Sequence, residues 1–561
     1  MQKSFGTLLS LTLAMAGAAL LTACATPPPS VPPAASGTSA DAPVTPKVNR
    51  LVMALPTPGE GNNVGRDVGT PDNFQLRPMY EYLVGVDAKT GKFYPQLATD
   101  WKLEPDGRSW RFQLRKGIPF QGTWGEFTAK DFEFAVWNIA QTDSTNGNSA
   151  LFRNTVTIEV VNDYELVFHE KERDADIFNL ASELVGGVDV KSKAHFDALG
   201  GKVNMTTPPP AGTGPYQFKE RQQGAFVRFE RMPGKHWRAT ADFPEFEFRW
   251  QKEASTRLAS LLTGEVQMTP LPKDLQQQAL NQGMKLARGS VPAQRIFLSF
   301  QGVYVNDVTD PSKGYKYPNS PLMDVRVRQA LSKAINRDEL NKALFGGKAE
   351  TMVLDDFHPN WEGWDPTWQQ RFPEAYGYDL ARARQLLQDA GYGPAKPLKT
   401  TMLMTALSQV PESADVQEAI AGMWRSAGVD VQLNNLDTTE ATRQSRAMAF
   451  DNQLTLTATA AHQILGYRIY GLYILGNLRG NNVEVPEIGD AWLKVRDELD
   501  FSKHPPLLKA MGEVAFRNFN HVPLFWLPTE TLYNPTFVAG YEFPGNISSL
   551  WTHVYNIKAA G

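Results

Sequence analysis

The chain has 561 residues, of which 42% are hydrophobic and 21% are charged, which is an ordinary globular composition. Its length allows roughly two to four domains, taking about 150 residues for each. The formal net charge of −4 is mildly acidic and argues against a nucleic-acid partner.

Residues 1–23 predict a cleaved export signal that is not part of the fold. Lys3 supplies the charged start, and the apolar run Phe5–Leu20 is too short and too rich in Ala and Gly for a transmembrane helix. The run leads into Leu-Thr-Ala-Cys, which resembles a bacterial lipobox, so Cys24 is predicted to carry a lipid anchor. The alternative is a stray thiol in a simple secretory signal. Because Cys24 is the only cysteine, an intrachain disulfide and a cysteine-ligated metal cluster are excluded.

Residues 24–47 are rich in Pro and Ala and predict an extended tether without a core. Asn49–Leu55 is then a short apolar strand, and its carboxyl end is where ligands gather in α/β sheets. The glycines of Gly59–Gly65 superficially match a dinucleotide-binding motif. However, the third glycine comes one residue late and no helix clearly begins there, so we reject nucleotide binding. No other stretch reaches about 18 consecutive apolar residues, so no further membrane span is predicted.

The segment Met79–Ile139 alternates strand and turn signals before a helix. Trp110–Arg115 alternates apolar and polar residues strictly, which predicts a half-buried strand. A helix is predicted to start at Thr128, with apolar residues at helical spacing along one face. Val156–Phe168 then predicts a hairpin. Together these elements indicate a β-rich region with a single helix packed against it.

The stretch Ala211–Tyr216, Ala-Gly-Thr-Gly-Pro-Tyr, predicts a tight and stiff turn. Glycine tolerates a positive φ, and proline fixes φ near about −65°. Alternating apolar and polar residues follow on both sides of Gly224 and predict a hairpin.

Helix, glycine and strand signals recur through the second half of the chain. The predicted helices are Ala254–Thr263, which ends at Gly264, one helix capped by Asn336, one capped by Asp379, and Ser413–Ala427. Met402–Met404 and Val429–Leu433 are predicted to be neighbouring strands of one sheet. A helix, a glycine and then a strand is the order found in βαβ units, so the fold class is α/β.

Several of these strings together resemble the family 5 extracellular solute-binding proteins, the oligopeptide-, dipeptide- and nickel-binding components of ABC importers. The strings are Gly-Thr-Gly-Pro-Tyr at 212–216, the motifs between Tyr80 and Phe132, and Asp-Val-Arg-Val-Arg-Gln-Ala-Leu at 324–331, which continues to Arg337. The resemblance covers roughly residue 49 to the carboxyl end. We expect the arginines of the last string to lie on solvated helix faces with local ion pairs.

The resemblance implies a two-lobed periplasmic-binding-protein fold with an additional inserted β-rich domain, three domains in all. The predicted boundaries are 48–82, 188–297 and 521–561 for the first lobe, 83–187 for the inserted domain, and 298–520 for the second lobe. Arg295–Phe300 and His521–Leu527 resemble the strands that cross between the lobes in this family. Lobes joined in this way close on a ligand by hinge bending.

Two aromatic stretches are candidates for the ligand site, because a closing cleft needs apolar walls with a few placed polar groups. The candidates are Phe357, His358, Trp361, Trp364, His462, Tyr467 and Tyr470. The alternative for each of these aromatic residues is packing between the lobes.

The family resemblance also bears on the charge of the ligand. In peptide-binding members an Asp-Pro-like element follows the strand that corresponds to Asn452–Thr457, and its acid pairs with the amino terminus of the peptide. Residues 458–462 contain no acid. Because a buried ammonium without a carboxylate is costly, a neutral or anionic ligand such as a glycoside, an opine-like compound or a blocked peptide is favoured.

The implied function is that of the substrate-binding component of an ABC importer. Such a component captures a peptide or other small solute in the cleft and delivers it unchanged to a membrane permease with ATPase subunits. It is expected to be an exported, lipid-anchored monomer that needs no cofactor or metal.

Two alternatives stay open, a secreted lipid-anchored hydrolase and a non-transporting receptor or chaperone of the same fold. The sequence contains no Gly-x-Ser-x-Gly and no His-Glu-x-x-His motif. Asp355 and Asp356 form an acidic pair, but adjacent side chains do not face one site, and we expect them in a solvated loop. A glycosidase that uses two carboxylates is not excluded.

Overall fold

The computed structural model describes residues 45–561, apart from 57–60, 64–65, 67–74, 88–91, 145, 147–148, 150–151, 154–155, 172, 174–180, 184–187, 405–406, 408–409, 437–439, 441–442, 445–446, 461–482 and 543–552. Residues 44–561 form one compact unit. The predicted export signal, Cys24 and most of the predicted tether lie outside the described residues.

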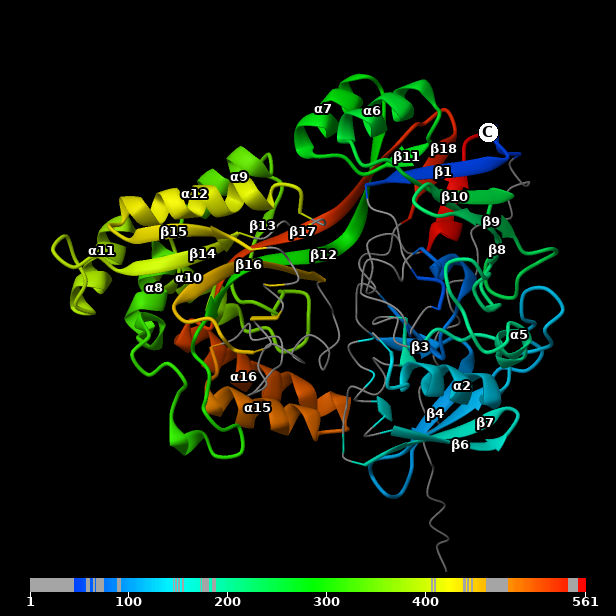
Figure 1. The fold of residues 1–561 in the computed structure, drawn as a ribbon, viewed down its shortest axis with the longest axis horizontal. Coiled ribbons are helices and arrows are strands. Elements are labelled where there is room, and N and C mark those ends of the chain that lie inside the picture. The colour runs from blue at the N-terminus through cyan, green and yellow to red at the C-terminus, as the bar shows by residue number, and fades with distance from the viewer. Residues whose placement is uncertain are drawn as a thin grey trace, which may run out of the picture. The chain divides into compact units, whose positions relative to one another are not determined.

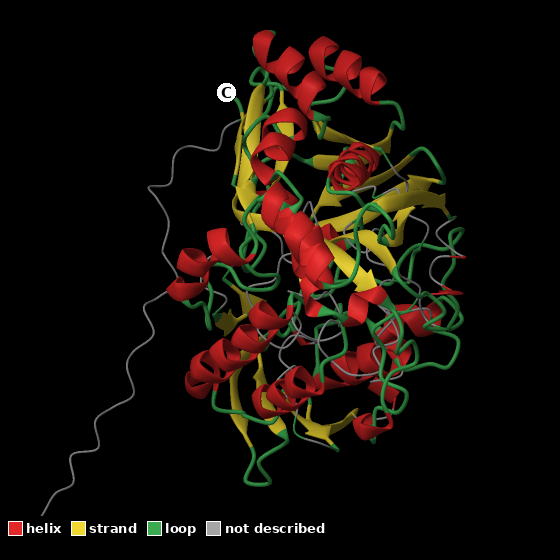
Figure 2. Ribbon diagram, turned by 90° about the vertical axis from the view of Figure 1, so that its left-hand side faces the viewer, coloured by secondary structure: helices red, strands yellow, loops and turns green. Residues whose placement is uncertain are grey.

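The described residues form a mixed α/β structure (Figure 1, Figure 2). The strands are β1 (Arg50–Leu55), β2 (Val84–Val86), β3 (Phe93–Pro95), β4 (Ala98–Leu103), β5 (Trp110–Leu114), β6 (Val156–Asn162), β7 (Glu165–Glu170), β8 (Tyr216–Gln222), β9 (Phe226–Arg231), β10 (Glu245–Trp250), β11 (Met268–Thr269), β12 (Lys285–Gln301), β13 (Glu350–Thr351), β14 (Lys399–Met404), β15 (Asp430–Asn435), β16 (Gln453–Ala460), β17 (His521–Tyr533), β18 (Val538–Tyr541) and β19 (Ile557–Ala559). The helices are α2 (Ala129–Ile139), α5 (Lys193–Ala198), α6 (Ala254–Thr263), α7 (Lys273–Asn281), α8 (Val325–Lys333), α9 (Arg337–Leu344), α10 (Pro366–Ala375), α11 (Leu380–Asp389), α12 (Ser413–Ser426), α15 (Pro486–Arg496) and α16 (His504–Asn518). Short 3₁₀ helices are η1 (Arg77–Met79), η2 (Pro311–Lys313), η3 (Pro321–Met323), η4 (Phe501–Lys503) and η5 (Val554–Asn556).

An 11-stranded sheet runs through the described part of the chain, in the order β15-β14-β16-β12-β17-β11-β1-β10-β9-β8, with β13 paired to β17. Its two ends have separate hydrophobic clusters. We use "first lobe" for the end from β11 to β8 with α6 and α7, and "second lobe" for the end from β15 to β16 with α8 to α16. The long antiparallel strands β12 and β17 belong to both ends (Figure 1).

The ladder between β12 and β17 is irregular at its centre. Pro292 pairs with Pro528, and the register shifts on both sides of that step. Proline has no backbone N–H, so neither residue can donate a ladder hydrogen bond there. The pair is therefore regular from Lys285 to Arg288 and weakly bonded where it passes from one lobe to the other, and a further register shift lies between Ile296 and Phe297.

A second, antiparallel sheet has the order β4-β5-β7-β6, and α2 packs on β6. These elements surround their own hydrophobic cluster, which includes Trp110, Phe132 and Phe168. We call this part, together with β2 and β3, the inserted domain. It agrees with the predicted β-rich insertion, whose boundaries remain a prediction.

Local sequence signals explain where several elements begin and end. Asp379 caps α11 by accepting from the Arg382 N–H, and Asn336 caps α9 by accepting from the Glu339 N–H. Gly264 ends α6 with a φ of 78°. The predicted hairpin of β8 and β9 is confirmed. The prediction that β14 and β15 are neighbours in one sheet is also confirmed, and the two strands pair in parallel.

The Gly-Thr-Gly-Pro-Tyr turn owes its glycines to a close approach of another segment. A Cβ on Gly214 would lie 2.6 Å from the Met79 carbonyl carbon and 2.6 Å from the Pro78 carbonyl oxygen. The Gly214 N–H donates to the Met79 carbonyl at 2.8 Å, and Gln121 Nε2 donates to the same oxygen at 2.9 Å. Neither Gly212 nor Gly214 has a positive φ, so the expectation based on positive φ is wrong. These positions require glycine because the neighbouring backbone leaves no room for a Cβ.

Two arginines of the predicted solvated string are buried. Arg326 is exposed and pairs with Asp324, as expected. Arg328 is 4% exposed and donates to the carbonyls of Leu322 and Asn518, at 2.6 and 2.7 Å. Because its charge is taken out of water, the pKa of Arg328 falls to about 10, which still leaves it protonated at neutral pH. The expectation of solvated faces is therefore wrong for Arg328 and for Arg337.

Arg337 connects three parts of the second lobe. Its Nε donates to the Pro523 carbonyl at 2.8 Å, Nη1 to the Tyr376 carbonyl at 3.1 Å, and Nη2 to Ser332 Oγ at 2.9 Å. Burial lowers the pKa of Arg337 to about 10. A planar guanidinium can reach partners in several directions, which a single ammonium cannot.

We predict that Gly214→Ala lowers the free energy of unfolding by about 3 kcal/mol, because the added methyl overlaps the backbone of residues 78 and 79. Gly393→Ala is the matched control, since Gly393 has no positive φ and a Cβ there meets nothing within 4 Å. Denaturant unfolding followed by circular dichroism measures both. Equal stability of the two variants would contradict the close-approach explanation.

We also predict that Arg337→Lys costs about 2 kcal/mol, although the charge is kept, because buried carbonyls lose their donors. Arg326→Lys, on an exposed face, changes the free energy of unfolding by less than about 0.5 kcal/mol. The comparison uses the same unfolding measurement. A loss at Arg337 no larger than that at Arg326 would show that charge alone matters.

Candidate functional site

The strand register brings several side chains to one face of the sheet where β12 and β17 enter the second lobe. Arg295 on β12 pairs with Thr459 on β16 and with Trp526 on β17. Trp526 in turn pairs with Glu350 on β13. Because residues directly opposite one another project to the same face, these four side chains form one row across four strands.

A buried ionic cluster surrounds Arg295. Its Nη1 donates to Asp355 Oδ1 at 2.8 Å and also contacts Asp356, and its Nε donates to Thr459 Oγ1 at 2.7 Å. His521 Nδ1 lies 3.1 Å from Asp355 Oδ2. The side chains of Arg295, Asp355, Asp356 and His521 are each at most 4% exposed. Two carboxylates thus share one guanidinium and one imidazole.

The acidic pair is not in a solvated loop, so that expectation is wrong. Asp356 has a φ of 68°, and this left-handed backbone lets both adjacent carboxylates reach the same guanidinium. Burial alone would raise the pKa of Asp355, but the charge of Arg295 and the hydrogen bond with His521 outweigh burial and hold the pKa below its usual value. Asp355 is therefore ionised at neutral pH.

An aromatic cluster lies beside the ionic one. The ring centroids of Trp361 and Trp526 are 5.1 Å apart, and His358 lies 5.0 Å from Trp361 and 5.4 Å from Trp526. Met352 packs with the two tryptophans. His358 Nε2 is 3.1 Å from Glu350 Oε1, whose side chain is 52% exposed. The side chains of His358, Trp361, Trp526 and Met352 are at most 6% exposed, so the cluster is buried, with one carboxylate at its exposed edge.

The predicted ligand residues are divided between two environments. His358 and Trp361 lie in the aromatic cluster, next to the crossing strands. Phe357 and Trp364 instead pack around Trp368, in the core of the second lobe, with centroid distances of 5.1 and 5.6 Å. The predicted residues His462, Tyr467 and Tyr470, like Cys24, lie outside the described residues.

Sequence reasoning did not identify Arg295 or Trp526 as part of this site. Each stands in a strand that reads as apolar, Arg-Ile-Phe-Leu-Ser-Phe for Arg295 and Val-Pro-Leu-Phe-Trp-Leu for Trp526. A cation at the start of such a strand was the available signal, because a charge there needs a buried partner.

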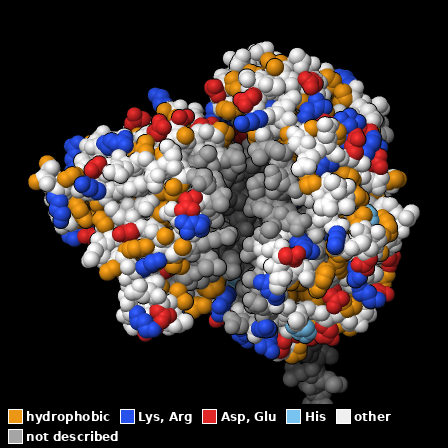
Figure 3. Space-filling model, in the orientation of Figure 1, with side chains coloured by type: hydrophobic (Ala, Val, Ile, Leu, Met, Phe, Trp, Pro, Cys, Tyr) orange, Lys and Arg blue, Asp and Glu red, His pale blue; other side chains and the backbone are white. Residues whose placement is uncertain are grey.

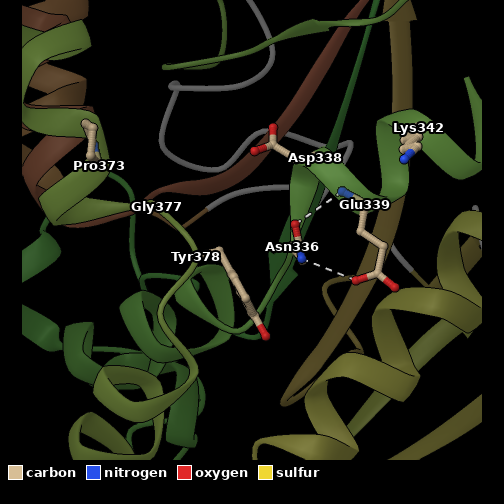
Figure 4. A pocket seen from close by; sticks show the side chains of 7 residues that line it. All are labelled: Asn336, Asp338, Glu339, Lys342, Pro373, Gly377 and Tyr378. Atoms are coloured by element: carbon tan, nitrogen blue, oxygen red, sulfur yellow. Dashed lines mark hydrogen bonds between the residues drawn. The ribbon is translucent and has the colours of Figure 1, made fainter. Parts of the chain in front are cut away.

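An open surface pocket of about 700 Å³ lies elsewhere, at the start of α9. It is lined by Asn336, Asp338, Glu339, Lys342, Pro373, Gly377 and Tyr378 (Figure 4). Two of these residues are hydrogen-bonded to each other. The Asn336 side chain accepts from the Glu339 backbone N–H and donates to the Glu339 carboxylate. None of the predicted ligand residues lines this pocket.

The described residues carry neither a membrane helix nor a metal cluster. No helix among them is long and apolar enough to cross a bilayer. In the same residues, no group of three or more His, Cys, Asp or Glu side chains is arranged to hold a metal ion. On the face shown in Figure 3, Lys and Arg are interspersed with Asp and Glu.

We predict that Asp355→Asn lowers the free energy of unfolding at pH 7 by about 2 kcal/mol, because Arg295 and His521 lose a charged partner. The pKa of Asp355 is lowered by folding, so its contribution is present above about pH 4, the unfolded pKa, and is lost as pH falls through the folded value. The difference between wild type and variant should therefore shrink below about pH 4.

Unfolding measured from pH 7 down to pH 3 tests this. The exposed Asp490 on α15 provides the control, and Asp490→Asn should leave the wild-type pH profile unchanged. A difference between wild type and Asp355→Asn that stays constant over this range would contradict the lowered pKa of Asp355.

Known proteins are similar to this chain in sequence and in fold. A sequence profile of the bacterial extracellular solute-binding proteins, family 5 Middle, matches residues 92–468. The dipeptide-binding protein of Escherichia coli (strain K12) is 26% identical over 385 residues, which cover 65% of this chain and 67% of that protein. Di/tripeptide-binding protein 3 of Pseudomonas aeruginosa (strain UCBPP-PA14) is 23% identical over 512 residues, covering 86% of this chain and 91% of that protein.

Solved structures share the fold over most of the chain. DppA from Helicobacter pylori in complex with the peptide STSA has a TM-score of 0.72 at 20% identity and covers 91% of this chain and 98% of that one. NikA from Brucella suis in complex with Fe(III)-EDTA has a TM-score of 0.74 at 18% identity, covering 91% and 100%. AgaA from A. tumefacien R10 in complex with agropinic acid has a TM-score of 0.71 at 18% identity, covering 91% and 99%. The family profile spans well over half of the sequence, and this chain belongs to the bacterial extracellular solute-binding proteins of family 5.

Proposed function

We propose that this protein is the solute-capturing component of an ABC importer, which closes its two lobes on a small solute and passes it unchanged to a membrane permease. The observation that carries this proposal is the β12–β17 pair. It joins the two lobes through a ladder interrupted at Pro292 and Pro528, which suits a hinge. Membership of the family and the shared fold support the same function.

Names of similar proteins support a peptide or a related small solute as the ligand. The relatives include dipeptide- and di/tripeptide-binding proteins, and the similar structures include complexes with the peptides STSA and Met-Leu and with agropinic acid.

The charge at the end of β16 favours a ligand without a free ammonium there. In the peptide-binding members that this chain resembles, an acid follows this strand. Here the strand carries Thr459, whose hydroxyl accepts from the Arg295 guanidinium at 2.7 Å. We propose a neutral or anionic group at this position, as in a blocked peptide, a glycoside or an opine-like compound. An ammonium there would lack a directly facing carboxylate on β16.

We propose that His358 and Trp361 contribute to the ligand face, with Trp526 beside them. A closing cleft needs apolar walls and a few polar groups, and these aromatic side chains, each at most 6% exposed, would supply part of such a wall. Phe357, Trp364, His462, Tyr467 and Tyr470 remain predicted ligand residues.

The family's extracellular role supports export of the globular part. We propose that Cys24 is acylated and that residues 24–47 tether the protein to the envelope membrane as a monomer. Its partners would then be a permease and its ATPase subunits.

One arrangement in the inserted domain bears on the hydrolase alternative. Ser109 Oγ lies 3.0 Å from His169 Nδ1, and His169 Nε2 lies 2.7 Å from Glu159 Oε2, in the order of a serine, histidine and carboxylate triad. However, Ser109 is only 1% exposed and its hydroxyl is bonded to Asp106 at 2.5 Å. The hydroxyl is therefore held in a turn and closed to substrate, so we favour solute capture over hydrolysis.

Thermal unfolding of the purified full chain with two matched probes tests the proposed ligand class. We predict that N-acetyl-Met-Leu raises the melting temperature more than Met-Leu, because the blocked compound presents no ammonium to the Arg295 and Thr459 region. A ligand at 100 times its Kd stabilises the folded form by about 2.7 kcal/mol. Trp361→Ala should reduce the shift for every compound that binds.

Sub-micromolar binding of Met-Leu would overturn the proposed ligand class while leaving solute capture intact. Release of free amino acids from either probe during the incubation would overturn solute capture and favour the hydrolase.

A further inference from the structure

The crossing strands β12 and β17 join the two lobes, and a separate contact joins the inserted domain to the second lobe. Phe501, the first residue of η4, lies between α15 and α16. Its ring centroid is 6.0 Å from that of Phe93 on β3, at an interplanar angle of 57°. Phe501 also packs against the hydrophobic cluster of the inserted domain, to which it contributes the one second-lobe side chain among the described residues.

The turn that carries Phe501 is rigid by its own hydrogen bonds. Asp500 Oδ1 accepts from the Ser502 N–H at 3.1 Å and from Ser502 Oγ at 2.6 Å. The Asp500 N–H donates to Glu498 Oε1 at 2.8 Å. The Phe501 ring also rests edge-on against His504, at 5.1 Å. The conformation of the Phe501 ring is therefore fixed before contact, and little conformational entropy is lost when the ring packs against the inserted domain.

Phe93 is held equally firmly on the other side. It pairs with Val86 in the β2–β3 ladder. Val86 is further fixed because its N–H donates to Glu183 Oε1 at 3.0 Å, and that carboxylate also accepts from Tyr94 OH at 2.9 Å. Glu183 is buried, so this end of the inserted domain is tied into a closed polar network.

The two aromatic residues are only half-buried, although most of their neighbours are fully buried. Such a contact between two rigid bodies can form and separate as a unit. The first and second lobes are also joined by the β12–β17 ladder, which is interrupted at Pro292 and Pro528. A small apolar contact away from a soft hinge biases the angle at which the hinge rests.

We propose that Phe501 and Phe93 form a clasp that stabilises the closed arrangement of the two lobes and so sets the fraction of molecules ready to retain a solute. This step goes beyond the proposed function, because the clasp acts on closure whatever the ligand is. A threefold loss of closed molecules raises the apparent Kd about threefold for every solute alike. The clasp thus tunes affinity without changing selectivity.

The test measures the distance between the lobes and needs no ligand. Because Cys24 is the only cysteine, the full chain with Cys24→Ser accepts spin labels at Val161→Cys and Leu493→Cys. These residues are 43% and 40% exposed, on β6 of the inserted domain and on α15 of the second lobe. Pulsed electron spin resonance then gives the populations at short and long separations.

We predict that Phe501→Ala lowers the ratio of short to long separations at least threefold, and that Phe93→Ala does the same. The double variant should show no more than the single variants, since each one already removes the whole contact. Phe501→Leu, which keeps an apolar side chain, should retain more than half of the closed population.

Leu507→Ala is the matched control, because Leu507 follows on α16 but packs in the core of the second lobe. It should leave the distances unchanged. An unchanged distribution in Phe501→Ala, additive effects of the two single variants, or an equal shift in Leu507→Ala would each overturn the clasp. None of these outcomes bears on whether the protein transports a solute, so failure of the clasp and failure of the proposed function are distinguishable.

Discussion

The structure depends on how two long strands are held together while their central ladder is interrupted. On the first-lobe side of Pro292 and Pro528, Arg288 on β12 donates to Glu530 on β17 at 2.8 Å, and Lys273 on α7 contacts the same carboxylate. On the second-lobe side, Arg295 is fixed by two carboxylates. Ion pairs therefore stiffen the ladder on both sides of the proline step, which confines bending to the step itself.

The buried charged residues have different partners in the two lobes. Burial would raise the pKa of Glu530, but Lys273 and Arg288 outweigh burial and lower it, so this carboxylate stays ionised. In the second lobe, Arg328 and Arg337 are paired with backbone carbonyls of residues such as Asn518 and Pro523. They satisfy groups at the end of α16 and along β17 that would otherwise be buried without donors. Buried cations thus fix the route by which the chain returns to the crossing strands.

Local patterns were sufficient to predict the elements but not their burial. Helix α6 and its stop at Gly264, the cap at Asp379 and the β8–β9 hairpin follow from residues a few positions apart. The need for Gly212 and Gly214 comes from a backbone more than 100 residues earlier in the chain. In the same way, Asp355 and Asp356 are buried because they form ion pairs with Arg295, which lies on β12. No pattern in the residues around Asp355 and Asp356 predicts this long-range contact. The predicted ligand residues are the hardest case, since His358 and Phe357 are neighbours in sequence with different surroundings.

The row formed by Arg295, Thr459, Trp526 and Glu350 connects the crossing strands to the proposed ligand site. Each of these residues is paired through a strand that either crosses between the lobes or adjoins one that does. Under the proposed function, a solute that contacts Trp361 therefore acts, through Trp526, on the strands that join the lobes. Arg295 cannot follow a moving ligand, because its guanidinium is already committed to two carboxylates and a hydroxyl. Under the proposed function, recognition therefore depends on shape and on a fixed local charge, and the contacts of a ligand favour the closed arrangement.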